Sequence, residues 1–192
     1  IGDWSSDVCS SDLMNEVYKP LYLRDFPIVY TDPETAEMIK YAANAFLATK
    51  ISFINELASL SEKVGADIKE VSKGIGLDGR IGSKFLHAGP GYGDSCFPKD
   101  TRALCKVARD LGTPMSIVET VIEVNEKVKE RMVKKILDIF GGCVSGKTLT
   151  VLGITFKPNT DDMREAPSLT ILPELLKMNA KIRVVDPKGY EQ

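Results

Sequence analysis

One uninterrupted stretch, from Pro33 to Gly65, constrains the fold of this chain more than any other segment. Thr31-Asp32-Pro33-Glu34 supplies a capping side chain, a proline for the first helical position and an acidic first turn, which together mark a helix start. No glycine or proline then occurs before Gly65. The sequence therefore predicts one helix of about 30 residues, roughly 45–50 Å long. Apolar residues recur along it at helical spacing, namely Ile39, Ala43, Phe46, Leu47, Ile51, Ile54, Leu57 and Ala58.

A helix of that length is typical of a domain spine or a dimer interface. Three further helices are predicted between Gly65 and Gly141-Gly142, which marks a boundary. They span residues 67–74, 100–108 and 113–140, with residues 74–95 as a loop. Residues 31–140 are therefore predicted to form a mainly helical region.

Beyond Gly141-Gly142 the pattern changes from helical to alternating strand and helix. Residues 147–154 and 181–186 are apolar enough for buried strands, and residues 167–177 suit a helix between them. One βαβ unit needs a larger parallel sheet to bury both faces, and the sequence ends at Gln192 before such a sheet is complete. Residues 141–192 are therefore expected to be the truncated start of an α/β domain in a longer protein.

The first residues differ from the rest of the chain. Ser5-Ser6-Asp7 and Ser10-Ser11-Asp12 form a polar repeat with no helical or strand period, so residues 1–13 are predicted to be a non-native or disordered leader. Residues 14–30 read as a connector, because their apolar part contains Pro27.

The loop that ends in Cys96 carries the strongest chemical signal. Gly89-Pro90-Gly91-Tyr92-Gly93-Asp94-Ser95-Cys96 places a thiol directly ahead of a predicted helix. Unpaired N–H groups and the positive end of the helix dipole favour the thiolate, which is the nucleophilic form. Lys99 adds positive charge nearby, and the glycines allow the backbone to approach a ligand closely.

Other side chains could assist such a thiol. Lys40 and Asn44 lie four residues apart, so one helix face presents a cation and an amide donor to a developing oxyanion. Arg80 suits either an anion clamp or an ordinary exposed position. His87 is the only histidine, so a Cys-His hydrolase would have to use it, with no evident partner to orient its ring.

One segment fits a nucleotide-binding pattern, and another lies at a position where open sheets bind ligands. Gly74-Ile75-Gly76-Leu77-Asp78-Gly79 fits the dinucleotide pattern but follows a predicted helix where a strand is required, so it predicts no site. The segment from Phe156 to Arg164 follows the strand that ends near Gly153, at the edge of an open sheet where ligands bind. A charged surface loop is the alternative interpretation.

Composition narrows the possible partners. The formal net charge of −2 gives no support for binding nucleic acid or an anionic membrane, and no apolar run is long enough to span a bilayer. The four cysteines lack the spacing of a zinc site or disulfide framework. Free thiols and the lack of an export signal predict a cytoplasmic setting.

Three ordered segments together resemble the UDP-glucose/GDP-mannose dehydrogenase family: residues 37–47, the Cys96 loop, and residues 153–167. The resemblance covers residues 14–192. It implies a mainly α central dimerisation domain with one very long helix, followed by the start of an α/β Rossmann-like UDP-binding domain. The family's NAD-binding domain would precede this chain. The implied reaction oxidises the C6 alcohol of a UDP-sugar to a carboxylate with two NAD+, through a thioester on the cysteine.

The same resemblance implies roles for individual residues. Cys96 would be the nucleophile, Lys40 and Asn44 would stabilise the oxyanion, and Asp100 would position or activate water. Arg80 would reach substrate from the neighbouring subunit of a homodimer that forms through the long helix. The remaining implied substrate contacts are His87, Gly89, Gly91, Tyr92, Gly93, Phe156 and Lys157. The implied cofactor contacts are Cys96, Lys99 and Arg164.

Flanking residues favour UDP-glucose as substrate. Members that use GDP-mannose tend to have leucine where this chain has Phe97, and those that use UDP-N-acetylmannosamine usually have histidine where it has Ser95. Two departures stand out. Asp94 replaces the family's usual glycine, and its charge disfavours both the thiolate and a bound diphosphate. The chain is also short, so we expect no turnover from it alone. A non-catalytic dimerisation module with a decayed site is the competing interpretation.

Overall fold

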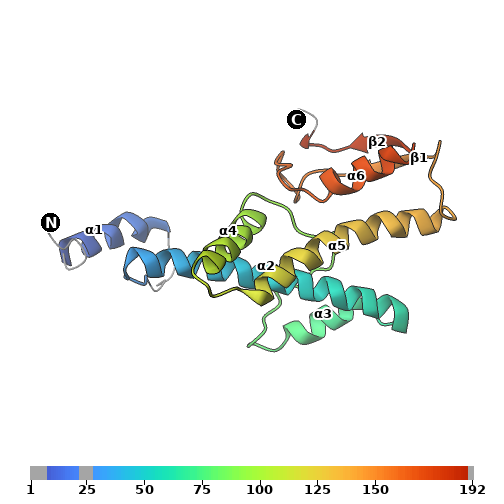
Figure 1. Cartoon of the computed structure of the whole chain (residues 1–192). Coiled ribbons are helices and arrows are strands. Elements are labelled where there is room, and N and C mark those ends of the chain that lie inside the picture. Colours follow the sequence, from blue (N-terminus) through green and yellow to red (C-terminus); the bar gives the residue numbers. More distant parts are fainter. Residues whose placement is uncertain (1–7, 22–27, 190–192) are drawn as a thin grey trace. The chain divides into compact units, whose positions relative to one another are not determined.

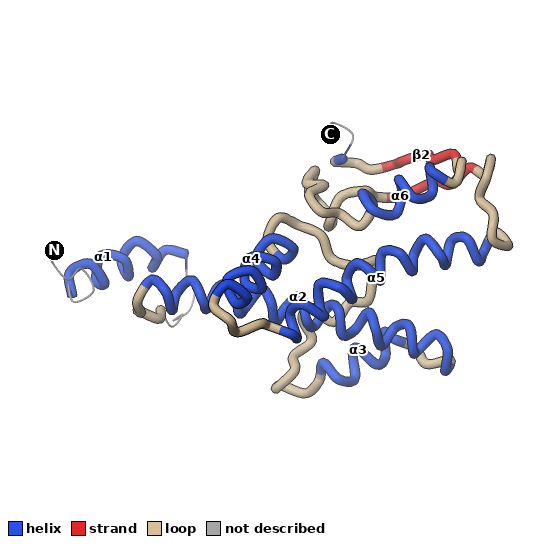
Figure 2. The backbone as a smooth tube through the Cα atoms, in the orientation of Figure 1, coloured by secondary structure: helices blue, strands red, loops and turns tan. Residues whose placement is uncertain are grey.

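The protein is described by a computed structural model that covers residues 8–21 and 28–189. The chain divides into two compact units, Ile1–Ala42 and Ala43–Gln192. Helix α2, Pro33–Val64, runs through the boundary between them (Figures 1 and 2).

Helix α2 confirms the predicted long helix, with 32 residues. Its start is capped as predicted, because Asp32 Oδ1 accepts the Thr35 N–H at 2.7 Å. Within the second unit, one face of α2 is buried. That face consists of Ala45, Ala48, Ser52, Ile54, Asn55, Ala58 and Ser61.

The first unit also holds helix α1, Val8–Tyr18, and a short 3-10 helix, Lys19–Leu21. The sequence of residues 1–13 shows no helical period and predicted no helix there. That prediction was wrong for Val8–Leu13, which forms part of α1. This segment contains no glycine or proline to interrupt a helix, and its described side chains are exposed, so it forms a helix without forming a core. Residues 1–7, the rest of the predicted leader, lie outside the described residues, as does Pro27 of the connector.

Helices α3, Ile68–Gly76, α4, Phe97–Asp110, and α5, Ser116–Ile139, confirm the other three predicted helices. Helix α4 starts three residues earlier than predicted. Pro98 fits the first turn, where no backbone donor is needed, and the Cys96 carbonyl accepts the Asp100 N–H at 2.8 Å. The thiol therefore lies at the cap of α4 itself.

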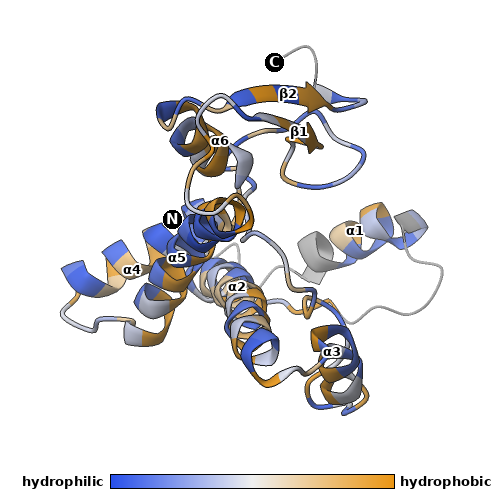
Figure 3. Cartoon of the chain, turned by 90° about the vertical axis from the view of Figure 1, so that its right-hand side faces the viewer, coloured by the Kyte–Doolittle hydropathy of each residue, from blue (hydrophilic) through white to orange (hydrophobic). Residues whose placement is uncertain are grey.

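The C-terminal part is one parallel βαβ unit: strand β1, Thr148–Leu152, helix α6, Ser168–Lys177, and strand β2, Lys181–Val185. Thr148 lies opposite Lys181 and Leu152 opposite Val185, so the strands pair in register over five residues. Helix α6 lies between the strands and α5 (Figures 1 and 3). A buried cluster joins these elements through Val133, Val144, Ile171, Leu175 and Ala180.

Asp186, directly after β2, ties the ends of the two strands together. Its carboxylate accepts the N–H groups of Ile154, Lys188 and Gly189 at 2.8–2.9 Å, and a longer bond from Thr155. These donors lower its pKa to about 2, led by Ile154. An acid at this position in a dinucleotide-binding fold would contact a ribose. Here backbone N–H groups already donate to the Asp186 carboxylate. The βαβ unit therefore does not bind a dinucleotide ribose through this acid.

Candidate active site

Cys96 is the N-cap residue of α4, and its thiol takes no part in capping. The side chain is partly exposed, and Sγ lies 3.8 Å from the Ser95 hydroxyl oxygen. Cys105 is buried inside α4, and its pKa is raised by that burial. Among the cysteines whose side chains the structure describes, Cys96 is therefore the one that meets both requirements for a nucleophile, access and a helix N-terminus.

A buried carboxylate lies one turn into the same helix. Asp100 is only 2% exposed, and its Oδ2 accepts a hydrogen bond from Asn44 Nδ2 of α2 at 2.5 Å. Its other oxygen, Oδ1, lies 3.0 Å from the Lys99 ammonium. The structure thus brings Asn44 together with Lys99 and Asp100. Asn44 and Asp100 are 56 positions apart in the sequence. Lys40 lies four residues before Asn44 on α2, but in the first compact unit, so its role beside Cys96 remains a prediction.

The glycine-rich loop ahead of Cys96, residues 89–95, is held by two buried asparagines. Asn125 of α5 accepts the Tyr92 N–H at 2.8 Å and donates to the Tyr92 carbonyl at 3.1 Å. Asn55 of α2 accepts the Gly89 N–H at 2.8 Å. A side chain at Gly91 would meet Asn125 Oδ1 at 3.0 Å, so glycine permits this close clamp.

Neither asparagine was predicted from the sequence as a site residue. The available signal was an amide on an otherwise apolar helix face, since Asn55 follows Ile54 and Asn125 lies between Val121 and Val128. A buried amide on such a face needs hydrogen-bond partners, but the sequence does not reveal which backbone supplies them.

A pocket of about 290 Å³ opens beside this loop. Aromatic residues form much of it, and the Phe97 ring meets Phe85 and Tyr92 edge to face, each at 6.0 Å between centroids. Burial raises the pKa of Tyr92 to about 12. The predicted substrate contacts in the lining are His87, Gly91, Tyr92, Gly93, Phe156 and Lys157. These residues, from separated segments of the chain, thus line one pocket, and their contact with substrate remains a prediction.

Arg80 does not line this pocket. Its guanidinium pairs with Asp78 two residues earlier, at 2.6 Å, and its side chain is 90% exposed. Within one chain it therefore points to solvent, and its predicted contact across a subunit interface remains a prediction.

The loop between β1 and α6 forms the far wall of the pocket. Lys157 Nζ lies 5.0 Å from the centre of the Phe156 ring. Arg164 pairs with Asp162 at 2.6 Å and holds the pKa of that carboxyl at about 2. The pKa of Arg164 is raised mainly by Asp162 and slightly by Asp94 and Cys96, so its charge lies within electrostatic reach of the thiol loop.

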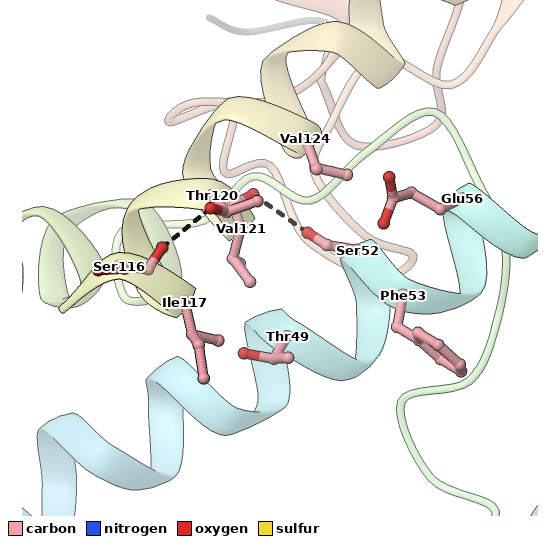
Figure 4. Close-up of a pocket in the computed structure, with 9 residues that line it drawn as sticks. All are labelled: Thr49, Ser52, Phe53, Glu56, Ser116, Ile117, Thr120, Val121 and Val124. Carbon is pink, nitrogen blue, oxygen red and sulfur yellow. Dashed lines mark hydrogen bonds between the residues drawn. The ribbon is translucent and has the colours of Figure 1, made fainter.

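A second pocket of about 270 Å³ adjoins the first and shares Gly91 and Phe156 with it. It lies at the carboxyl end of β1, between Gly153 and Ser168 at the start of α6. The prediction that the end of this strand offers a binding surface is consistent with that position. A third pocket, of about 310 Å³, lies between α2 and α5, and none of the predicted site residues lines it (Figure 4).

Neither a metal site nor a membrane span is found in the described part of the chain. Residues 8–21 and 28–189 hold no cluster of three His, Cys, Asp or Glu side chains placed to bind a metal ion. None of the helices in those same ranges combines the length and apolar character that crossing a bilayer requires.

Asp94 occupies a left-handed backbone conformation, with φ of 87°. Asp94→Gly is therefore expected to relieve about 1 kcal/mol of strain and to raise the melting temperature. It also removes a negative charge beside Cys96, so alkylation of Cys96 by iodoacetamide at neutral pH should be faster. Peptide-level mass spectrometry measures that rate, and Asp94→Asn separates charge from strain. Equal rates in all three proteins would contradict the electrostatic argument.

Comparisons with known proteins agree with these features. The model of the central domain of the UDP-glucose/GDP-mannose dehydrogenase family matches residues 34–127. The model of that family's UDP binding domain matches residues 150–192. The UDP-glucose 6-dehydrogenase of Rhizobium meliloti (strain 1021) is 55% identical over 191 residues, which is 100% of this chain and 44% of that protein.

Solved structures give the same result. A UDP-glucose dehydrogenase from Pyrobaculum islandicum matches with a TM-score of 0.88 at 40% identity, over 97% of this chain and 42% of that one. A UDP-D-ManNAc dehydrogenase from Pyrococcus horikoshii matches with a TM-score of 0.77 at 25% identity, over 94% and 42%. The chain thus spans less than half the length of these relatives.

Proposed function

This chain belongs to the UDP-glucose/GDP-mannose dehydrogenase family, and from that premise we propose that it supplies the thiol and sugar-binding part of an enzyme that oxidises UDP-glucose to UDP-glucuronate. One observation carries the proposal. Cys96 is the partly exposed N-cap residue of α4, with Sγ 3.8 Å from the Ser95 hydroxyl oxygen, one turn from the Asn44–Asp100 pair and beside the aromatic pocket. This arrangement suits covalent catalysis on an aldehyde carbon.

The chain's own residues account for the covalent steps. The Cys96 thiolate attacks the C6 aldehyde, and the resulting oxyanion is stabilised by Asn44 and, from the first unit, by Lys40. The Asn44 amide carries two N–H groups, so one can stay on Asp100 while the other donates to the oxyanion. Asp100 then accepts a proton from the water that hydrolyses the thioester, which releases the carboxylate and restores the thiol.

NAD+ is the implied cofactor, and some of the residues present fit it. The exposed Arg164 guanidinium, near the thiol loop, and the Lys99 ammonium suit the cofactor's diphosphate. When bound, NAD+ would supply the hydride acceptor for each of the two oxidations of the sugar carbon. Since the thiol must stay reduced, we place the reaction in the cytoplasm.

UDP-glucose is favoured over the other sugars by the comparisons. Relatives named as UDP-glucose enzymes reach 55% and 40% identity, whereas the UDP-D-ManNAc enzyme reaches 25%. The test uses this chain completed at both ends with the matching segments of the Rhizobium meliloti relative, here called the completed chain. With UDP-glucose it should form two NADH per sugar, and GDP-mannose and UDP-N-acetylmannosamine should give far less. Failure to oxidise any of the three would favour the non-catalytic module.

We also propose that two copies pair through α2. Phe46, Phe53 and Leu60 recur every seven residues on this helix and are 65%, 51% and 56% exposed. Phe53 and the exposed Ile117 both border the pocket between α2 and α5 (Figure 4). A face this apolar, on the helix that the family uses for pairing, suits a second copy of the chain.

Phe53→Glu is therefore expected to weaken the dimer by about 100-fold, because a charge at the centre of an apolar interface loses its hydration. Sedimentation equilibrium measures the dissociation constant. Val107→Glu is the matched control, since Val107 is also 51% exposed but lies on α4. A Phe53→Glu dimer as tight as that of Val107→Glu would show that α2 is not the interface.

A further inference from the structure

Helix α4 carries Cys96 at its N-cap and, nearly two turns on, an arginine that reaches the loop between β1 and α6. Arg102 Nη1 donates to Glu165 Oε1 at 2.9 Å and Nη2 donates to Oε2 at 3.1 Å. Glu165 lies in the loop between β1 and α6, 63 positions along the chain. The parallel two-bond geometry makes this a directional contact, although the side chains are 49% and 43% exposed.

Backbone contacts meet at the same place. The Asp94 N–H donates to the Arg164 carbonyl at 2.9 Å, which joins the thiol loop to the β1–α6 loop. Gly93 packs closely against Glu165, the residue after Arg164. A Cβ added at Gly93 would lie 2.5 Å from the Glu165 carbonyl oxygen. The two loops are thus seated on one another with no room for a side chain between them.

The two seated residues adopt unfavourable backbone conformations. Asp94 has φ of 87° and Glu165 has φ of 53°, both in the left-handed region that residues other than glycine seldom adopt. Such conformations persist only where surrounding contacts enforce them. At Glu165 one such contact is the ion pair with Arg102, which also lowers the pKa of the Glu165 carboxyl, and it acts beside the backbone contacts of Gly93 and Asp94.

We propose that Arg102 and Glu165 are a positioning pair, which seats the β1–α6 loop on the thiol loop and thereby sets the width of the pocket that binds the nucleotide sugar. Phe156 and Lys157 belong to the seated loop, whereas Gly91–Asp94 belong to the thiol loop. The pair touches neither pocket directly, since neither side chain lines one. The identity of the ligand rests on the proposed function, but the seating of the two loops does not.

The first experiment measures hydrogen exchange of the Asp94 amide in the 192-residue chain by NMR. Glu165→Gln and Arg102→Gln each remove one charge and keep the approximate shape, so we expect Asp94 exchange about fivefold faster in each. The reversed pair, Arg102→Glu with Glu165→Arg, should restore slow exchange, because the two charges still face one another. If the pair contributed only to overall stability, the reversed pair would not restore slow exchange specifically at the Asp94 amide.

Arg109→Gln is the matched control. Arg109 lies on the same helix and pairs with Glu119 of α5 at 2.9 Å, away from the thiol loop. It should leave Asp94 exchange unchanged. Asp94 exchange that is unaltered by Glu165→Gln, or equally accelerated by Arg109→Gln, would overturn the proposal.

A second measurement extends the test to the ligand. In the completed chain, Glu165→Gln should raise KM for UDP-glucose about fivefold and leave kcat within about twofold, because the pair shapes the pocket without contacting the reacting atoms. A fall in kcat with unchanged KM would contradict the positioning role. Lack of turnover by the unsubstituted completed chain would refute the proposed function, while Asp94 exchange would still decide the seating of the loops.

Discussion

Replacing Cys96 with serine is expected to lower kcat for the complete oxidation of UDP-glucose by at least about 10³-fold in the completed chain. A serine hydroxyl remains protonated at neutral pH and is a much weaker nucleophile toward an aldehyde carbon than a cysteine sulfur. The first oxidation needs no thiol, so the loss should fall on the second. The measurement is NADH formed per sugar, which should drop from two to at most one.

Cys143→Ser is the control for this experiment. Cys143 is an exposed cysteine that follows α5. Cys143→Ser should leave both kcat and the NADH yield within about twofold of their original values. If Cys96→Ser retained two NADH per sugar at a similar rate, the covalent route would be wrong and the oxidation would have to use water directly.

Gly93→Ala is expected to have the second-largest effect, although it adds one methyl group. Its Cβ would lie 2.5 Å from the Glu165 carbonyl oxygen and 2.9 Å from the Ala166 Cα. Both are backbone atoms, so no side chain can turn away and one of the two loops must move. Overpacking of this kind costs about 1–3 kcal/mol, and here it also separates the two walls of the pocket.

Thermal unfolding of the 192-residue chain measures the lost stability, and KM for UDP-glucose in the completed chain measures the distorted pocket. Gly89→Ala is the matched control for thermal unfolding, because an added Cβ at Gly89 meets no atom within 4 Å and its φ is not positive. A Gly93→Ala protein as stable as Gly89→Ala would show that the loops separate without cost.

Local signals explain why so much of the fold was predictable. Asp32 and Asp67 each cap a helix through hydrogen bonds to residues two or three positions away, and such contacts need no other part of the chain. The long helix follows from an unbroken segment with helical apolar spacing. The same reasoning failed from Val8 to Leu13, a segment that is helical although its sequence shows no helical apolar spacing.

The sequence by itself determined the helices, the two strands and the thiol at a helix start, because capping, periodicity and glycine positions act over a few residues. Only the tertiary structure decided what surrounds that thiol. Asn44 meets Asp100, Asn125 clamps Tyr92, and Arg102 reaches Glu165 across separations of 56, 33 and 63 positions. The packing of the helices and the βαβ unit against one another decides these hydrogen-bond partners. In the sequence, an amide or carboxylate looks the same whether or not the packed structure places a partner beside it.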